Sequence, residues 1–276
     1  MDASSQTTRL TLCGSLSLHP VSLGAAMHLA GYRALGLPFT YVPFKVKDLA
    51  GAIAGMRALG IRGFGVSMPY KQAIMPLLDA VDLQASRIGA VNTVVNEDAG
   101  ITGHNTDAHG AVRALEEVVH ILGLRVLLLG AGGAARAVAH GVRDKGAVLT
   151  IANRDRQKAE ALALETGANA AGLDELERAG DYEIVINASS VGMADIDPSN
   201  PIPEAALRPG QVVMDIVYKP IETELVRAAR RRGAHTIHGG RMLLHQAARQ
   251  FELYTGHPAP LDVMDAALHQ QIEKTG

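Results

Sequence analysis

The feature that most constrains the fold is a glycine-rich turn between an apolar run and a helix-compatible segment. The run Val126-Leu-Leu-Leu129 leads directly into Gly130-Ala-Gly132-Gly-Ala-Ala135, and a helix-compatible stretch continues to Lys145. In a strand-turn-helix unit the first glycine permits a sharp turn, the second lets the backbone approach a pyrophosphate, and a small third residue lets the helix pack on the strand. The segment predicts a Rossmann-type dinucleotide site, with a tight turn that holds no ligand as the plainer alternative.

The residues that follow the next expected strand, 148–152, indicate which cofactor this turn would hold. A carboxylate there binds the ribose of NAD, whereas an arginine binds the additional phosphate of NADP. Arg154 occupies this place and Lys158 can add charge, although Asp155 opposes the preference. We expect NADP(H), with Arg154 and Lys158 as solvated surface charges being the alternative. The expected contacts are Gly130, Ala131, Gly132, Gly133, Ala134, Asn153, Arg154 and Lys158.

Length and charge limit the classes to which the chain can belong. Its 276 residues suggest two domains or one large α/β unit, and 26 Lys and Arg against 28 Asp and Glu leave a net charge of −2. Such a balance offers no basic field for nucleic acid or an anionic membrane. Cys13 is the only cysteine, the histidines show no metal-ligand spacing, and residues 1–8 lack the pattern of a signal peptide. We expect a cytoplasmic monomer or homodimer without a metal.

Expected strands alternate with expected helices along the chain. In the first third, β-rich runs at 9–16, 39–46, 63–68 and 91–96 alternate with helical patterns at 22–35 and 48–59. Connections of this length join parallel strands, so this part predicts a parallel sheet with covering helices. A second α/β unit is expected after residue 107, with a helix over 108–122, strands at 125–129, 148–152, 183–187 and 211–216, and helices at 241–254 and 261–273.

Several polar and glycine-containing motifs follow one another along nearly the whole chain. They are Gly65-Val-Ser67-Met-Pro69-Tyr-Lys71, Gly89-Ala-Val-Asn92-Thr93, Gly103-His-Asn105-Thr106-Asp107, the glycine turn with Asn153-Arg154, Asn187-Ala-Ser189-Ser-Val-Gly192-Met193, Asp215-Ile-Val-Tyr218-Lys-Pro220 and Met242-Leu-Leu-His-Gln246-Ala. In this order they resemble the shikimate/quinate dehydrogenase family. The resemblance implies an NADP-dependent oxidoreductase that interconverts 3-dehydroshikimate and shikimate, or a closely related cyclic hydroxy acid, a reaction of aromatic amino acid biosynthesis.

The resemblance also implies how two α/β domains share the chain. The carboxy-terminal helices would return to the amino-terminal domain, so that residues 1–107 and 241–276 form a substrate-binding domain and residues 108–240 form a Rossmann NADP-binding domain. The substrate, a small molecule, would bind in a cleft between them. Further cofactor contacts are implied at Ser189, Ile216, Gly239 and Met242.

Lys71 and Asp107 match the family's catalytic pair. Reduction of a ketone needs a hydride from the nicotinamide and a proton for the developing alkoxide, which an ammonium group can donate while it stabilises the growing charge. A carboxylate beside Lys71 would keep the ammonium protonated and oriented. Taken singly, most of the site residues are more readily explained as cap, turn, strand-end or helix-surface residues than as ligand contacts. The implied substrate contacts are Ser22, Ser67, Asn92, Tyr218 and Gln246.

Four positions depart from the family pattern and resemble a divergent shikimate-dehydrogenase-like branch. Pro20 stands where the first of two serines is usual, Gly65 replaces an asparagine, His238 an aspartate and Arg241 a glycine. Loss of one hydrogen bond to a carboxylate costs about 1.5–3 kcal/mol, so shikimate would bind weakly unless another group, such as Arg241, pairs with its carboxylate. Two alternatives stay open: an NAD-dependent quinate-type dehydrogenase, and a non-catalytic NADP-binding sensor, which retention of the catalytic pair opposes.

Overall fold

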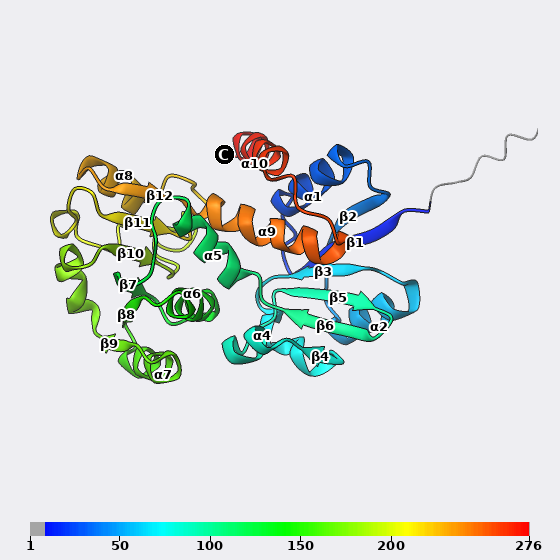
Figure 1. Ribbon diagram of the computed structural model, residues 1–276, viewed down its shortest axis with the longest axis horizontal. Coiled ribbons are helices and arrows are strands. Elements are labelled where there is room, and N and C mark those ends of the chain that lie inside the picture. Colours follow the sequence, from blue (N-terminus) through cyan, green and yellow to red (C-terminus); the bar gives the residue numbers. More distant parts are fainter. Residues whose placement is uncertain (1–8, 276) are drawn as a thin grey trace, which may run out of the picture. The chain divides into compact units, whose positions relative to one another are not determined.

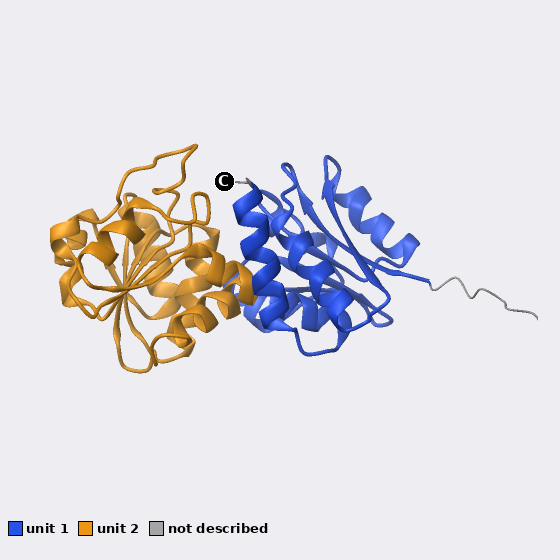
Figure 2. Ribbon diagram, turned by 90° about the horizontal axis from the view of Figure 1, so that it is seen from above, with its two compact units in different colours: residues 1–105, 247–275 blue, residues 106–246, 276 orange. Residues whose placement is uncertain are grey.

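A computed structural model of the protein describes residues 9–275 and divides the chain into two α/β units (Figure 1). Figure 2 colours the first unit, residues up to 105 with residues 247–275, apart from the second, residues 106–246. Within the described residues, each unit is built on one six-stranded sheet. Helix α9 (Gly239–Thr255) begins in the second unit and ends in the first.

The sheet of the first unit is mixed, with the strand order β2-β1-β3-β5-β6-β4. β1 pairs in parallel with β2 and β3, but β5 is antiparallel to both β3 and β6. The expectation of a parallel sheet is therefore wrong for this half, because only Asp98 and Ala99 connect β5 to β6 and a parallel connection needs a much longer crossover. The strands are β1 (Thr11–Ser17), β2 (Phe39–Lys45), β3 (Gly63–Val66), β4 (Ala80–Val81), β5 (Thr93–Glu97) and β6 (Gly100–His104).

Alternation along β3 separates the two faces of this sheet. Phe64 and Val66 join an apolar core with residues of α2, whereas Gly63 and Gly65 face α9. A Cβ atom on Gly63 would overlap the ring of Tyr254, so the glycines let α9 lie close to the strand. The helices of this unit are α1 (Leu23–Ala34), α2 (Leu49–Leu59), α3 (Tyr70–Ala73), α4 (Leu83–Ile88), the second half of α9, and α10 (Leu261–Thr275), with a 3₁₀ turn at Met75–Leu77.

An aromatic cluster fills the space between α1, β2 and the carboxy-terminal part of α9. His28 stacks on Tyr41 with ring centroids 4.5 Å apart and ring planes within 4°. Tyr32, Phe251 and Tyr254 surround the pair, and all five side chains are buried. These contacts anchor the end of α9 to the first unit.

The sheet of the second unit is parallel throughout, in the order β12-β11-β10-β7-β8-β9. This is the strand order of doubly wound dinucleotide-binding sheets. The strands are β7 (Arg125–Leu129), β8 (Val148–Ala152), β9 (Asn169–Ala171), β10 (Ile184–Asn187), β11 (Val212–Asp215) and β12 (His235–Ile237). The helices are α5 (Asp107–Glu116), α6 (Gly133–Asp144), α7 (Arg156–Thr166), α8 (Glu224–Arg231) and the first half of α9, with 3₁₀ segments at Leu173–Asp181 and Glu204–Ala206.

The helix expected over 108–122 is shorter than the sequence pattern suggests. α5 ends at Glu116, and the chain reaches β7 through a turn in which Gly123 adopts a φ of 77°. That left-handed conformation does not fit a helix, and Ile121 is buried in the core from the turn itself. The apolar periodicity that suggested a longer helix therefore comes partly from loop residues that also pack inward.

Candidate functional site

The expected cofactor residues of the second unit gather at the carboxyl edge of its sheet. Gly130 follows β7, Asn153 follows β8, Ser189 lies just past β10, and Ile216 follows β11. Because these strands are parallel, their carboxyl ends share one edge, which is where ligands bind in open α/β sheets. Gly239 begins α9 one residue after His238, which follows β12, and so lies near the same edge.

The geometry of the glycine turn fits a pyrophosphate. Gly130 has a φ of 116°, and a Cβ there would lie 2.7 Å from the carbonyl oxygen of Ala188, so only glycine is accommodated. Gly132 occupies the N-cap of α6, and Cβ atoms on Gly132 or Gly133 would meet no atom within 4 Å. Ala135 is fully buried where the helix packs on the sheet. The open space beside the amino end of α6 can thus receive phosphate oxygens.

The segment after β8 contains Asp155, the carboxylate that argued against NADP, and holds it in local contacts. Asp155 caps α7, with Oδ1 accepting the Lys158 amide at 3.4 Å and Oδ2 lying 3.5 Å from Lys158 Nζ. Asn153 Nδ2 donates to the backbone oxygen of Asp155 at 2.9 Å. Arg154 is exposed beside this cap. The acidic group is therefore held by its own helix and a neighbouring ammonium, which leaves Arg154 as the cationic side chain at the strand end.

A buried polar network supports the loops after β10 and β11. Asn187 Nδ2 donates to Asp215 Oδ1 at 3.0 Å, and the Thr223 hydroxyl donates to Asp215 Oδ2 at 2.7 Å. Burial raises the pKa of Asp215 to about 6, against the effect of these hydrogen bonds. Ser189 Oγ donates to Asn187 Oδ1 at 2.7 Å. The network fixes the backbone on which Ser189 and Ile216 are carried.

The first half of α9 lies close to its neighbours. A Cβ on Gly239 would lie 2.5 Å from the backbone oxygen of Val217, and a Cβ on Gly110 of α5 would lie 2.6 Å from the backbone oxygen of Met242. The same position on Gly110 is 2.9 Å from Cβ of Gln246. Glycines at both contacts let the segment that carries Met242 and Gln246 pack tightly within the second unit. Tyr218, expected to contact substrate, is half-buried shortly after β11.

Arg241 is paired with an acidic residue of its own unit. Its Nε donates to Glu117 Oε2 at 2.9 Å and its second guanidinium nitrogen to Oε1 at 2.5 Å, while His245 Nε2 lies 2.7 Å from the same Oε1. Burial opposes ionisation, but the hydrogen bonds from Arg241 and His245 hold the pKa of Glu117 below its usual value. The suggestion that Arg241 replaces the missing carboxylate contact is therefore not supported, because a ligand would have to displace Glu117.

Backbone hydrogen bonds bring the expected substrate residues of the first unit to one edge of its sheet. Val66 donates to the backbone oxygen of Asn92 at 2.6 Å, and Val91 donates to that of Lys71 at 2.8 Å. Asn92 in turn donates to the backbone oxygen of His104 at 3.0 Å, at the end of β6. Ser67 directly follows β3. Lys71, Ser67 and Asn92 therefore share the edge at which β1, β3 and β6 end.

Two further expected residues, Ser22 and Asp107, lie at the starts of α1 and α5. The Ser22 hydroxyl, at the start of α1, accepts a hydrogen bond from Gln271 Nε2 of α10 at 2.8 Å. Asp107, the first residue of α5, belongs to the second unit and lies two residues after Asn105, where the amino-terminal segment of the first unit ends.

Two buried residues beside Asn92, Thr93 and Gln250, were not among the expected site residues. Thr93 donates from its hydroxyl to Asn92 Oδ1 at 2.8 Å, and Gln250 of α9 donates to Thr93 Oγ1 at 3.0 Å. The adjacency of Thr93 to Asn92 was a usable signal. Gln250 offered none, since it is separated from Thr93 by 157 positions in the chain.

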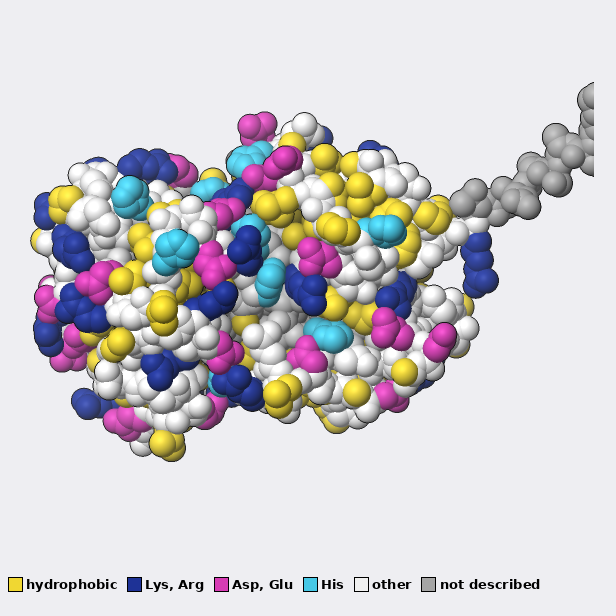
Figure 3. Space-filling view, in the orientation of Figure 1, with side chains coloured by type: hydrophobic (Ala, Val, Ile, Leu, Met, Phe, Trp, Pro, Cys, Tyr) yellow, Lys and Arg dark blue, Asp and Glu magenta, His cyan; other side chains and the backbone are white. Residues whose placement is uncertain are grey.

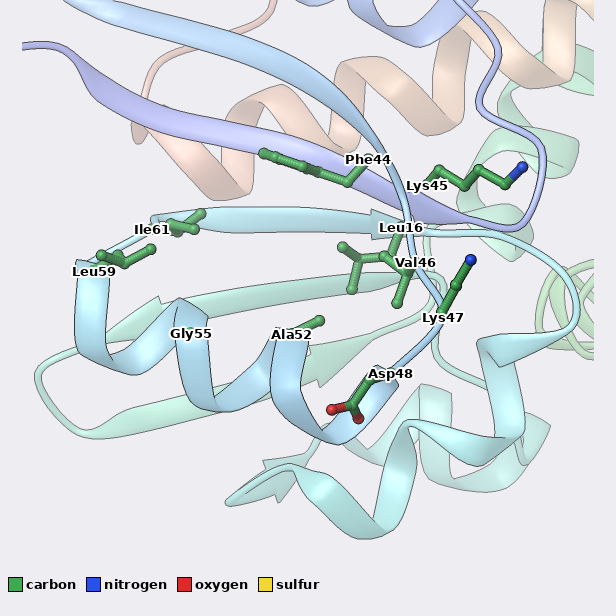
Figure 4. Close-up of a pocket in the computed structure, with 10 residues that line it drawn as sticks. All are labelled: Leu16, Phe44, Lys45, Val46, Lys47, Asp48, Ala52, Gly55, Leu59 and Ile61. Atoms are coloured by element: carbon green, nitrogen blue, oxygen red, sulfur yellow. The ribbon is translucent and has the colours of Figure 1, made fainter.

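The pocket in Figure 4 lies between α2 and the sheet, and its lining contains no residue expected to bind substrate or cofactor. On the face drawn in Figure 3, basic and acidic side chains are interspersed. Among residues 9–275, no group of three or more His, Cys, Asp or Glu side chains is arranged to hold a metal ion, and no helix is long and apolar enough to cross a membrane.

Family models match three parts of the chain. Residues 19–94 match the shikimate dehydrogenase substrate binding domain, residues 113–218 match shikimate / quinate 5-dehydrogenase, and residues 239–269 match the shikimate 5'-dehydrogenase C-terminal domain. Together these matches cover both units.

Individual relatives match over nearly the full chain. A protein of Moorella thermoacetica named shikimate dehydrogenase (NADP(+)) is 45% identical over 92% of this chain and 91% of its own. A crystal structure of shikimate dehydrogenase in complex with NADP+ has a TM-score of 0.91 at 39% identity, covering 96% of this chain and 97% of that one. The ligand-free 5-ketofructose reductase of Gluconobacter sp. has a TM-score of 0.87 at 34% identity, covering 95% and 99%.

Proposed function

The chain belongs to the shikimate/quinate dehydrogenase family, and from this premise we propose that it is an NADP(H)-dependent oxidoreductase that interconverts 3-dehydroshikimate and shikimate or a closely related cyclic hydroxy acid. The observation that carries the proposal is the match to shikimate dehydrogenase (NADP(+)) along almost the whole chain. Residues 1–107 with 241–276 would bind substrate and residues 108–240 the cofactor, in a cytoplasmic enzyme that is monomeric or homodimeric.

Lys71 would act as the acid and base at the reacting oxygen. When bound, NADPH supplies the hydride. The Lys71 ammonium donates its proton to the oxygen of the ketone as negative charge develops there, and takes a proton back in the oxidation. Asp107 would orient the Lys71 ammonium toward that oxygen.

Short polar side chains would hold the hydroxyl and carboxylate groups of the substrate. Ser67 and Asn92 share the sheet edge that also carries Lys71. Ser22, Tyr218 and Gln246 complete the proposed set. Hydroxyl and amide groups suit this task because each donates or accepts in a fixed direction.

The cofactor preference is proposed to depend on Arg154. Cofactor contacts would come from Gly130, Ala131, Gly132, Gly133, Ala134, Asn153, Arg154, Lys158, Ser189, Ile216, Gly239 and Met242. Arg154→Ala should raise KM for NADP+ about 10- to 100-fold and leave KM for NAD+ within about twofold, since only the 2′-phosphate contact is removed. Arg156→Ala is the matched control, because Arg156 is also exposed but pairs with Glu160. Equal effects on both cofactors would contradict this assignment.

A second substrate class is favoured by one observation. The 5-ketofructose reductase shares 34% identity and the whole fold with this chain, and Pro20, Gly65, His238 and Arg241 depart from the shikimate dehydrogenase pattern. A reductase of another polyhydroxylated ketone is therefore the second candidate. The carboxylate separates the two classes, because shikimate carries one and 5-ketofructose does not.

The test is the oxidation of shikimate and quinate by NADP+ at alkaline pH, with the reduction of 5-ketofructose by NADPH in parallel. Lys71→Ala should abolish turnover, whereas Lys274→Ala, which removes an exposed lysine of α10, should not. Lysine-dependent turnover of shikimate above that of the others would support the proposal. Tight NADPH binding with no turnover of shikimate or quinate would reject it.

A further inference from the structure

A chain of buried hydrogen bonds connects α9 to the proposed substrate residue Asn92. Gln250 Nε2 donates to the backbone oxygen of Asn92 at 3.3 Å and to Thr93 Oγ1 at 3.0 Å. The Thr93 hydroxyl then donates to Asn92 Oδ1 at 2.8 Å. The three side chains are 5% or less exposed, and all belong to the first unit.

The donor and acceptor of each of these three hydrogen bonds follow from one of the acceptors, the backbone oxygen of Asn92. A backbone carbonyl oxygen can only accept, so the Gln250 atom facing it must be the nitrogen. That nitrogen also donates to Thr93 Oγ1, and the hydroxyl has a single proton left to give, which goes to Asn92. The atom of Asn92 that receives it must be Oδ1. The orientation of the Asn92 carboxamide is thereby fixed by residues that need not touch a ligand.

We propose that Gln250 and Thr93 are positioning residues that hold Asn92 with its NH2 group turned away from Thr93, as a donor to a substrate oxygen. This inference rests on the proposed function, in which Asn92 binds substrate. A hydroxyl, carbonyl or carboxylate oxygen of the substrate can accept a hydrogen bond from this NH2 group. An ammonium group at the same place on the ring cannot accept, so amino-substituted analogues are selected against.

The absence of a side chain at Gly65 makes room for Gln250. A Cβ on Gly65 would lie 3.3 Å from Gln250 Nε2, 3.5 Å from Gln250 Oε1 and 3.1 Å from the Tyr41 hydroxyl. A longer side chain at this position of β3 would push the Gln250 amide away from Asn92 and Thr93.

Substitutions at both positions test the inference. Thr93→Val removes the hydroxyl at nearly constant shape, and Gln250→Met removes the amide at nearly constant length. Each should raise KM for shikimate about five- to tenfold, the value of one buried neutral hydrogen bond, with kcat within about twofold. Thr93→Ser retains the hydroxyl and should restore KM to within about twofold of the parent. The Kd for NADPH should not change in any of them.

A second measurement separates this inference from the proposed function. In a ¹⁵N-labelled protein, the NH2 resonances of Asn92, assigned by their loss in Asn92→Asp, should shift in Thr93→Val and Gln250→Met and return in Thr93→Ser. If the parent does not oxidise shikimate but these resonances respond as stated, the proposed function fails and the fixed orientation stands. If the parent oxidises shikimate but KM is unchanged in folded Thr93→Val and Gln250→Met, or Thr93→Ser behaves like Thr93→Val, the inference is wrong and the proposed function stands.

Discussion

The buried imidazole of His28 should make the stability of the first unit depend on pH, and His28→Phe should remove that dependence. His28 is fully buried against Tyr41. Burial lowers the pKa of His28 from 6.5 to about 4. The nearby Gln250 amide offsets part of this effect, although neither imidazole nitrogen has hydrogen-bond geometry to a partner among the described residues.

The sign of this pH dependence follows from which state, unfolded or folded, binds a proton at His28 at the higher pH. The unfolded chain protonates this imidazole near pH 6.5, whereas the folded protein keeps it neutral down to about pH 4. Stability is therefore fully present above pH 6.5 and lost as the pH falls toward 4. At 1.36 kcal/mol per pKa unit, the complete loss is about 3 kcal/mol, and about 2 kcal/mol of it falls between about pH 8 and pH 5.

Urea unfolding followed by circular dichroism over about pH 5 to 8 measures this difference. The free energy of unfolding of the parent, relative to His28→Phe, should fall by about 2 kcal/mol from the alkaline to the acid end. His257→Phe, at an exposed histidine of the same unit, is the control and should run parallel to the parent. A difference between the parent and His28→Phe that stays constant within about 0.5 kcal/mol across this range would refute the reasoning.

Substitutions at four further positions should change the free energy of unfolding in directions that the local packing decides. Gly55→Ala, in α2 beside the pocket of Figure 4, should raise the free energy of unfolding by about 0.5–1 kcal/mol, since its Cβ would meet no atom within 4 Å. Gly51→Ala, in the same helix, should instead lower the free energy of unfolding, because its Cβ would collide with the carboxylate of Asp48, which caps α2. Glu117→Gln should lower the free energy of unfolding by about 1–2 kcal/mol, because Arg241 and His245 lose a shared carboxylate, and an unchanged thermal midpoint would contradict the pairing. Thr223→Val should cost about 2–4 kcal/mol in urea unfolding, since it removes both the cap of α8 and a hydrogen bond to buried Asp215, whereas Thr223→Ser should cost less than about 1 kcal/mol.

Much of the cofactor edge could be predicted from local sequence. The turn at Gly130 was recognisable because a left-handed φ and a close backbone contact exclude other residues, so the chemistry of one position is visible in the sequence. The flanking strands were recognisable because buried parallel strands are short, continuous apolar runs. The reaction class followed from ordered motifs, and the matches over both units agree with it.

The wrong expectations concern the direction of neighbouring strands and the partner of a charged side chain, which local sequence patterns do not encode. An apolar run does not reveal whether a strand is parallel or antiparallel to its neighbour, and only the two-residue connection between β5 and β6 decides it. The charge of Arg241 was evident, but its partner Glu117 lies 124 positions earlier.

What the sequence determined by itself was the glycine turn, the two α/β units and the family, since each depends on residues that are neighbours in the chain or on their order. Only the tertiary structure decided that Gln250 reaches Thr93 and Asn92, residues 157 and 158 positions away. A hydrogen bond forms over about 3 Å and within a narrow range of angles. Contacts of that kind depend on how α9 folds back over β3, and no local pattern of residue types encodes them.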